Sequence, residues 1–93
     1  MATELHVELV AVEEKVFSGE AIEVLARTTE GELGILPHHT PLLGQLAEPG
    51  AVVLKFDDGT EAAYDVDGGF LSVTEEGVTI LAESCTPAAG STH

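Results

Sequence analysis

Apolar and polar residues alternate along most of this chain, which is the pattern of β-strands that bury one face. Between Glu4 and Ala11, the side chains of Leu5, Val7 and Leu9 share one face, and polar residues occupy most of the other. The same period of two recurs in the runs 22–27, 51–56, 61–66 and 78–83. Helical periodicity is nearly absent, so we expect a domain that is built from short strands.

Turn-forming residues separate these runs. The polar segments 57–60 and 74–77 each join two alternating runs, and Gly59 and Gly77 can adopt the positive φ that tight hairpin turns need. Further corners are expected at Ser18-Gly19, Glu30-Gly31 and Pro49-Gly50. Many short strands with frequent turns, and no helical segments between them, predict an all-β fold, either a small antiparallel β-sandwich or a flattened barrel.

Two adjacent glycines, Gly68 and Gly69, interrupt the run between Val66 and Phe70. Paired glycines inside a strand are typical of a bulge, a sharp bend or the close approach of another backbone. In a small sandwich they predict a strand that passes from one layer to the other.

Residues 31–43 read Gly-Glu-Leu-Gly-Ile-Leu-Pro-His-His-Thr-Pro-Leu-Leu and combine turn residues with five large aliphatic side chains. Pro37 and Pro41 exclude one regular strand or helix across the whole segment. We expect a short extended piece over 33–36, followed by a stiff apolar turn that packs on the protein's own core or on a partner. At least one of Leu42 and Leu43 should close the sandwich.

The chain has 93 residues, of which 44% are hydrophobic, and this is enough for one domain with a modest core. We expect the domain to span residues 1–85 and residues 86–93, which have no large apolar side chain, to form a disordered tail. Cys85 is the only cysteine, so no intramolecular disulfide forms. Neither a signal peptide nor an apolar run of membrane-spanning length is present, and we therefore expect a cytoplasmic location.

The net charge of the chain limits the classes of partner that it can bind. Seventeen acidic residues against three basic ones give a formal net charge of −14. Such a surface repels nucleic acid and anionic lipid, which excludes both as partners. It fits a partner that presents lysine and arginine, although a general need for solubility explains the same excess.

No group of residues stands out as a catalytic or ligand-binding site. His38 and His39 are neighbours on an extended chain and point to opposite sides, so they cannot easily share one metal ion. Asp65 and Asp67 are spaced like the start of a calcium loop, but Gly69 stands where the next oxygen ligand is needed. A glycine-rich phosphate loop and a nucleophile elbow are also missing. We expect no catalytic residue, no cofactor and no metal.

Several of these segments resemble a known family. Residues 31–43 are similar to the signature Gly-Glu-x-Gly-Ile-x-Pro-x-His-x-Pro-Leu-Leu in the β-domain of the epsilon subunit of the F-type rotary ATP synthase. Phe17-Ser18-Gly19 and the segments 66–73 and 78–83 resemble three other parts of that domain, in the same order. The resemblance spans roughly residues 4–84.

The resemblance implies a non-catalytic subunit of the central stalk, which ties the ring of c subunits to the gamma subunit while protons drive rotation and ATP formation. It places the chain at the cytoplasmic face of the bacterial cell membrane, as a peripheral part of the synthase. By the same resemblance, the gamma subunit is contacted by His39, Thr40, Pro41, Leu42 and Leu43. An acidic corner that meets the basic, polar loops of the c-ring is formed by Glu30, Gly31 and Glu32.

Other possibilities stay open. The family usually continues into a C-terminal helical hairpin, for which residues 86–93 are too few, so this is either a naturally short form or one cut after the β-domain. Without the hairpin, we expect coupling but no inhibition by hairpin insertion. From the residues alone, the chain also fits an unrelated cytoplasmic β-sandwich adaptor, or less well a carbohydrate- or metal-binding domain.

Overall fold

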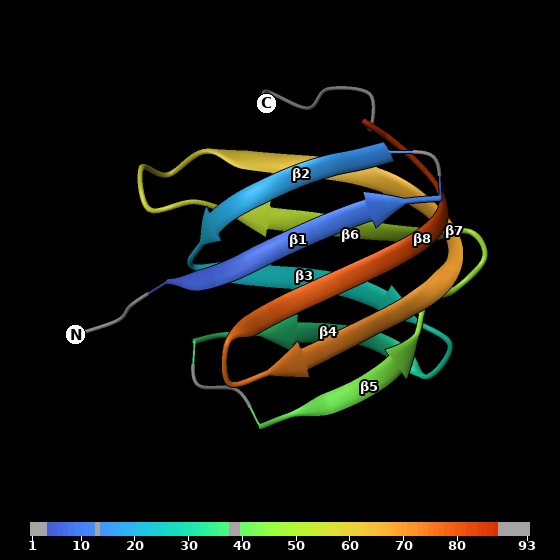
Figure 1. The fold of residues 1–93 in the computed structure, drawn as a ribbon, viewed down its shortest axis with the longest axis horizontal. Coiled ribbons are helices and arrows are strands. Elements are labelled where there is room, and N and C mark those ends of the chain that lie inside the picture. Colours follow the sequence, from blue (N-terminus) through green and yellow to red (C-terminus); the bar gives the residue numbers. More distant parts are fainter. Residues whose placement is uncertain (1–3, 13, 38–39, 88–93) are drawn as a thin grey trace.

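The computed structural model describes residues 4–12, 14–37 and 40–87, which form β-strands and turns and no helix (Figure 1). The prediction of an all-β domain is therefore confirmed, and these residues hold no helix with the length and apolar character that a membrane crossing requires. In chain order, the strands are β1 (Leu5–Ala11), β2 (Glu14–Ala21), β3 (Glu23–Thr28), β4 (Gly31–Ile35), β5 (Leu42–Gln45), β6 (Gly50–Lys55), β7 (Glu61–Thr74) and β8 (Gly77–Pro87).

The strands form one strongly bent sheet in the order β2-β1-β8-β7-β6-β3-β4, with β5 paired to β7 off this path. β6 pairs with residues 61–66 of β7, whereas β5 pairs with residues 70–73 of the same strand. The first layer thus contains β2, β1, the start of β8, the end of β7, and β5. The second layer contains the end of β8, the start of β7, β6, β3 and β4 (Figure 1).

The bend in β7 lies at Gly68 and Gly69, which have φ angles of 66° and 113°. A Cβ atom on Gly69 would collide with the carbonyl oxygen of Leu81 and lie 2.8 Å from the Cα of Ala82, so β8 leaves room only for glycine. On the edge of β7 that faces away from β8, the Leu46 N–H donates to the Gly69 carbonyl oxygen at 2.9 Å. The prediction that this strand passes between the layers is confirmed.

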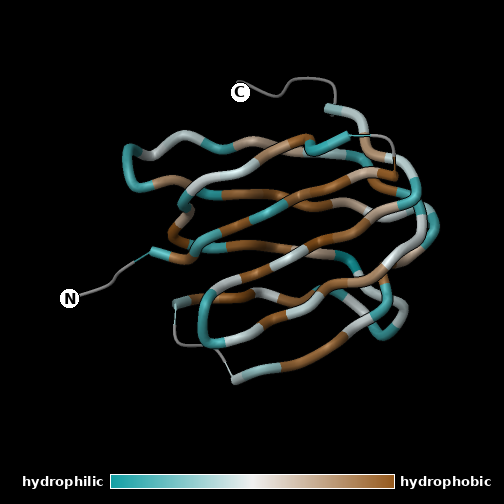
Figure 2. Tube along the Cα trace, in the orientation of Figure 1, coloured by the Kyte–Doolittle hydropathy of each residue, from teal (hydrophilic) through white to brown (hydrophobic). Residues whose placement is uncertain are grey.

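The core lies between the two layers and is filled by the apolar faces that the alternation predicts. Figure 2 shows where the hydrophobic residues lie along each strand. Val7, Leu9, Leu71 and Ile80 are fully buried in the first layer. The second layer supplies Val24, Ala26, Val52, Leu54, Ala62, Tyr64 and Val66. Among the described residues, no charged or hydrogen-bonding side chain other than the Tyr64 hydroxyl belongs to this core. The domain is therefore held mainly by aliphatic packing and by the backbone ladders.

Two features of the pairing differ from the expectation. β1 runs parallel to β8, with His6 opposite Gly77 and Ala11 opposite Ala82, so one strand pair in the sandwich is not antiparallel. The prediction of a corner at Ser18-Gly19 is wrong, because both residues lie inside β2 and pair with β1. β2 is an edge strand with few buried side chains, and such a strand shows no clear alternation in the sequence.

The last strand also extends further than expected. β8 continues to Pro87, with Thr86 opposite Asp65 and Pro87 opposite Tyr64, two residues past the boundary set at residue 85. A residue before proline prefers the extended conformation, which agrees with a strand that runs up to Pro87. Residues 88–93 of the expected tail lie outside the described residues.

Polar side chains hold the edge strand β2 against β1 on the outer face of the first layer. The His6 ring nitrogens lie 2.9 Å from a Glu20 oxygen and 2.8 Å from a Glu8 oxygen, and Lys15 Nζ lies 3.1 Å from Glu8. The hydrogen bonds to Glu20 and then to Glu8 raise the pKa of His6 above 6.5. Hydrogen bonds from Ser18, Lys15 and His6 lower the pKa of Glu8 to about 2.

We predict that the free energy of unfolding falls as the pH rises through the raised pKa of His6. Protonated His6 binds both carboxylates, so its stabilisation is complete below pH 6.5, the value for the unfolded chain, and is lost when the folded protein releases the proton. Urea midpoints measured between about pH 5 and about pH 9 should fall less for His6→Gln than for the unaltered chain. Parallel curves would contradict this account.

A second prediction concerns the bend. Gly69→Ala should lower the free energy of unfolding by more than about 1 kcal/mol, because its φ is positive and its Cβ has no space. Gly44→Ala is the matched control, since the nearest atom to its Cβ is 3.8 Å away, and it should change stability by less than about 0.5 kcal/mol. Urea unfolding of the two variants measures the difference, and equal losses would show that the bend does not depend on this contact.

Candidate interaction surfaces

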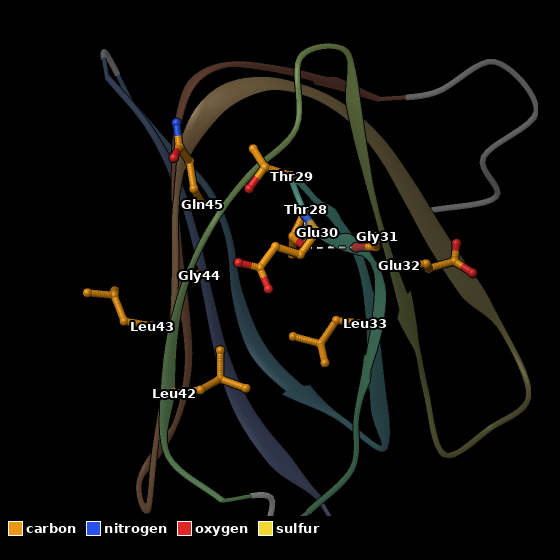
Figure 3. Close-up of a pocket in the computed structure, with 10 residues that line it drawn as sticks. All are labelled: Thr28, Thr29, Glu30, Gly31, Glu32, Leu33, Leu42, Leu43, Gly44 and Gln45. Atoms are coloured by element: carbon orange, nitrogen blue, oxygen red, sulfur yellow. Dashed lines mark hydrogen bonds between the residues drawn. The ribbon is translucent and has the colours of Figure 1, made fainter.

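The free edges of β4 and β5 face each other across a groove of about 510 Å³, which we name the seam groove (Figure 3). It is lined by residues 28–33, around the β3–β4 turn, and by residues 42–45 of β5. Next to the groove, Thr29 N–H donates to the Gln45 carbonyl oxygen at 3.0 Å, and Ala47 N–H donates to the Arg27 carbonyl oxygen at 3.1 Å. These bonds join β5 to the end of β3 and hold the two walls in place.

Leu33 and Leu42 point toward one another from opposite walls of the seam groove (Figure 3). Both are partly buried and pack against the core. Leu43 points away from the groove and is 74% exposed. The expectation that at least one of the two adjacent leucines closes the sandwich is confirmed, and that residue is Leu42.

The predicted acidic corner lies at the mouth of the same groove. The Thr28 hydroxyl donates to the Gly31 carbonyl oxygen at 2.7 Å and accepts from the Glu30 N–H at 3.2 Å, which fixes the turn. Glu30 and Glu32 are exposed; the Glu30 side chain lies beside the groove and Glu32 points away from it (Figure 3). Arg27 stands opposite Glu32 in the β3–β4 ladder, so one cation accompanies the two carboxylates.

The structure thus brings together two residue sets that the sequence assigned to different partners. Residues 30–32, Leu42 and Leu43 all border the seam groove, although the side chains of Glu32 and Leu43 point away from it. Thr40 and Pro41 are exposed and precede β5. His39, the fifth residue of the gamma-facing set, and its neighbour His38 lie outside the described residues.

Sequence reasoning missed an exposed apolar surface on the outer face of the first layer. Phe70 and Leu81 stand opposite each other in the β7–β8 ladder and are 55% and 50% exposed. Val12 and Leu43 are more than 70% exposed, and Val12, Phe70 and Leu81 line a hollow of about 550 Å³. We name these four residues the outer patch. The alternation of β8 already placed Leu81 opposite the core, which was the available signal.

The other described residues with reactive or metal-binding side chains do not gather into one site. Cys85 is half-buried, and burial, with smaller effects from Asp65 and Glu14, raises the pKa of its thiol, which keeps the reactive thiolate scarce. Within the ranges 4–12, 14–37 and 40–87, no group of three or more histidine, cysteine or acidic side chains is arranged to hold a metal ion.

Comparison with known proteins identifies the family. Residues 4–88 match the model of the β-sandwich domain of the ATP synthase delta/epsilon chain. The chain is 57% identical over 81 residues to the ATP synthase epsilon chain of Rhodococcus jostii and 56% identical to that of Mycobacterium avium, and each match covers 87% of this chain. It spans 66% of the Rhodococcus chain and 67% of the Mycobacterium chain, about two thirds of these relatives.

Solved structures show the same fold. A chain of the Euglena gracilis mitochondrial ATP synthase, determined as the OSCP/F1/c-ring assembly, aligns with a TM-score of 0.87 and 25% identity over 94% of this chain and 55% of its own length. A chain from the central stalk and c-ring of the Tetrahymena thermophila enzyme aligns with a TM-score of 0.71 at 18% identity. The chain described here therefore belongs to the ATP synthase delta/epsilon chain family and contains its β-sandwich domain.

Proposed function

We propose that this chain is a rotor subunit of the F-type ATP synthase and fixes the c-ring to the gamma subunit. The supporting observation is the identity of 51% to 58% with bacterial epsilon chains over most of its length. The Euglena chain that shares its fold was seen in an assembly with F1 and the c-ring, and the Tetrahymena chain in one of central stalk and c-ring.

In this role the chain is mechanical and carries out no chemistry of its own. Protons turn the membrane-embedded c-ring, and the chain and the gamma subunit turn with it at the cytoplasmic face of the bacterial cell membrane. The rotation of gamma then drives ATP formation in the head. A rigid body that holds its contact residues for ring and shaft on the two sides of the seam groove prevents slippage between them. The bent sheet suits this task because one continuous ladder of backbone hydrogen bonds joins both layers.

We assign the gamma contact to Thr40, Pro41, Leu42 and Leu43, together with His39. Leu43 offers an exposed apolar side chain, and Leu42 anchors β5 from the inside by packing on the core. Pro41 restricts the backbone before β5, which lowers the entropy lost when the loop binds a partner.

Leu43→Asp should weaken binding to purified gamma subunit by about tenfold or more, because it places a charge in an apolar contact while leaving the core intact. Ala63→Asp is the matched control, since it adds the same charge on the outer face of the second layer. Isothermal titration calorimetry measures both affinities, and circular dichroism checks both folds. Equal affinities for Leu43→Asp and the unaltered chain would remove Leu43 from the interface.

We assign the c-ring contact to Glu30, Gly31 and Glu32. The double change Glu30→Gln and Glu32→Gln should weaken binding to the detergent-solubilised c-ring several-fold at low salt, and the difference should vanish near 1 M salt, where screening acts within about 3 Å. The control changes Glu75 and Glu76, in the β7–β8 turn, to glutamine. A loss of the same size in the control would mean that only net charge matters.

A further inference from the structure

Two carboxylates converge at one end of the outer patch, over the bend in β7. A Cβ atom on Gly68 would lie 2.6 Å from a Glu83 carboxylate oxygen and 3.0 Å from a Glu48 carboxylate oxygen. Glu83 follows Leu81 by two residues on β8, so both side chains project from the same face of the strand. Glu48, Gly68, Phe70, Leu81 and Glu83 line the same hollow of about 550 Å³, which is therefore apolar at one end and acidic at the other.

No cation in the part of the chain that the structure describes neutralises this pair; Arg27 stands opposite Glu32 in the β3–β4 ladder. Among the described residues, Glu48 and Glu83 form no ion pair; Lys15 pairs with Glu8, and Lys55 lies 3.8 Å from Glu23. One oxygen of each carboxylate lies within 3.0 Å of the Cβ position at Gly68, so a cation that approaches this point would gain attraction from both. The side chain that fits has an apolar stem and a cationic end, as lysine and arginine do.

We propose that Glu48 and Glu83 bind a lysine or arginine of the gamma subunit, and that an apolar side chain beside this cation packs on Phe70 and Leu81. This inference rests on the proposed function and extends the gamma contact from Leu43 across the outer patch. The acidic pair fixes the register of docking, because a partner that places an apolar or acidic group over Gly68 leaves two carboxylates without a counter-charge.

A second copy of this chain is a poor occupant of the same surface. Self-association of two molecules with a net charge of −14 each would be opposed by repulsion between them. A twofold contact through the outer patch would also bring the acidic pairs of both copies together without a counter-charge, since Lys15 and Lys55 lie beside Glu8 and Glu23 and Arg27 stands on β3 in the second layer. The surface therefore requires a partner of opposite charge.

The test measures binding of purified gamma subunit to the full chain over a range of salt concentrations. The double change Glu48→Gln and Glu83→Gln should weaken binding about fivefold or more at low salt and flatten its salt dependence. Phe70→Thr, which keeps a strand-forming residue at an exposed position, should weaken binding about tenfold at every salt concentration. Glu75→Gln with Glu76→Gln removes the same charge at the β7–β8 turn and should leave the affinity within about twofold.

The outcomes separate this inference from the proposed function. If the unaltered chain fails to bind gamma, the proposed function and this inference both fall. If it binds, but the Glu48 and Glu83 change leaves the salt dependence as steep as before, only the assignment of the cation site falls. Dimers of the chain that disappear with Phe70→Thr in sedimentation experiments would overturn the choice of partner. Thermal unfolding of each variant shows whether any loss of binding comes from loss of the fold.

Discussion

The contact between Gly69 of β7 and the backbone of β8 at Leu81 and Ala82 is the constraint on which the rest of the domain depends. Two strands that cross from one layer to the other must bend together, and they can stay this close only where one of them has no Cβ atom. The bend also assigns β6 and β5 to different layers, although both pair with the same edge of β7. The opening between β4 and β5 follows directly, because neither strand has a neighbour there along the groove.

The seam groove and the outer patch, the two candidate interaction surfaces, both follow from this arrangement of strands. The seam groove exists because the sheet does not close between β4 and β5, and its mouth carries the acidic corner. The outer patch exists because β5, the end of β7 and the start of β8 place apolar residues on a face that the core does not use. A domain with this layout presents an acidic corner and an apolar surface from one rigid body, as a coupling between two larger parts of a machine requires.

Much of the fold could be predicted from local sequence. Alternation identified the buried faces of β1, β3, β6, β7 and β8, and Gly68-Gly69 identified the bend, because period-two burial and glycine conformation are set by neighbouring residues. The position of β2 was not predictable in this way, since its stability comes from pairing with β1 and from the His6, Glu8 and Glu20 side chains. The parallel pairing of β1 with β8 joins the two ends of the chain, and no local pattern encodes it.

The candidate surfaces could be predicted from the sequence only in part. The family resemblance pointed to residues 30–32 and 39–43 as contact residues, but only the folded chain shows that residues 30–32 and Leu42 border one groove. The alternation of side chains along β7 and β8 was enough to place Phe70 and Leu81 on the outer face. The pairing that makes them neighbours, and the convergence of Glu48 and Glu83 over Gly68, arise from contacts between segments that are distant in the sequence. Such surfaces follow from tertiary structure and not from a motif.

A cryo-EM structure of this chain bound to its gamma subunit and c-ring tests the central claim most directly. The account predicts that gamma covers the outer patch on the first layer, that the turn at residues 28–32 meets the loops of the c-ring, and that the bent sandwich keeps its shape in the complex. A map in which gamma packs on the outer face of the second layer, formed by β3 and β6, or in which the chain is absent from the rotor, would contradict it.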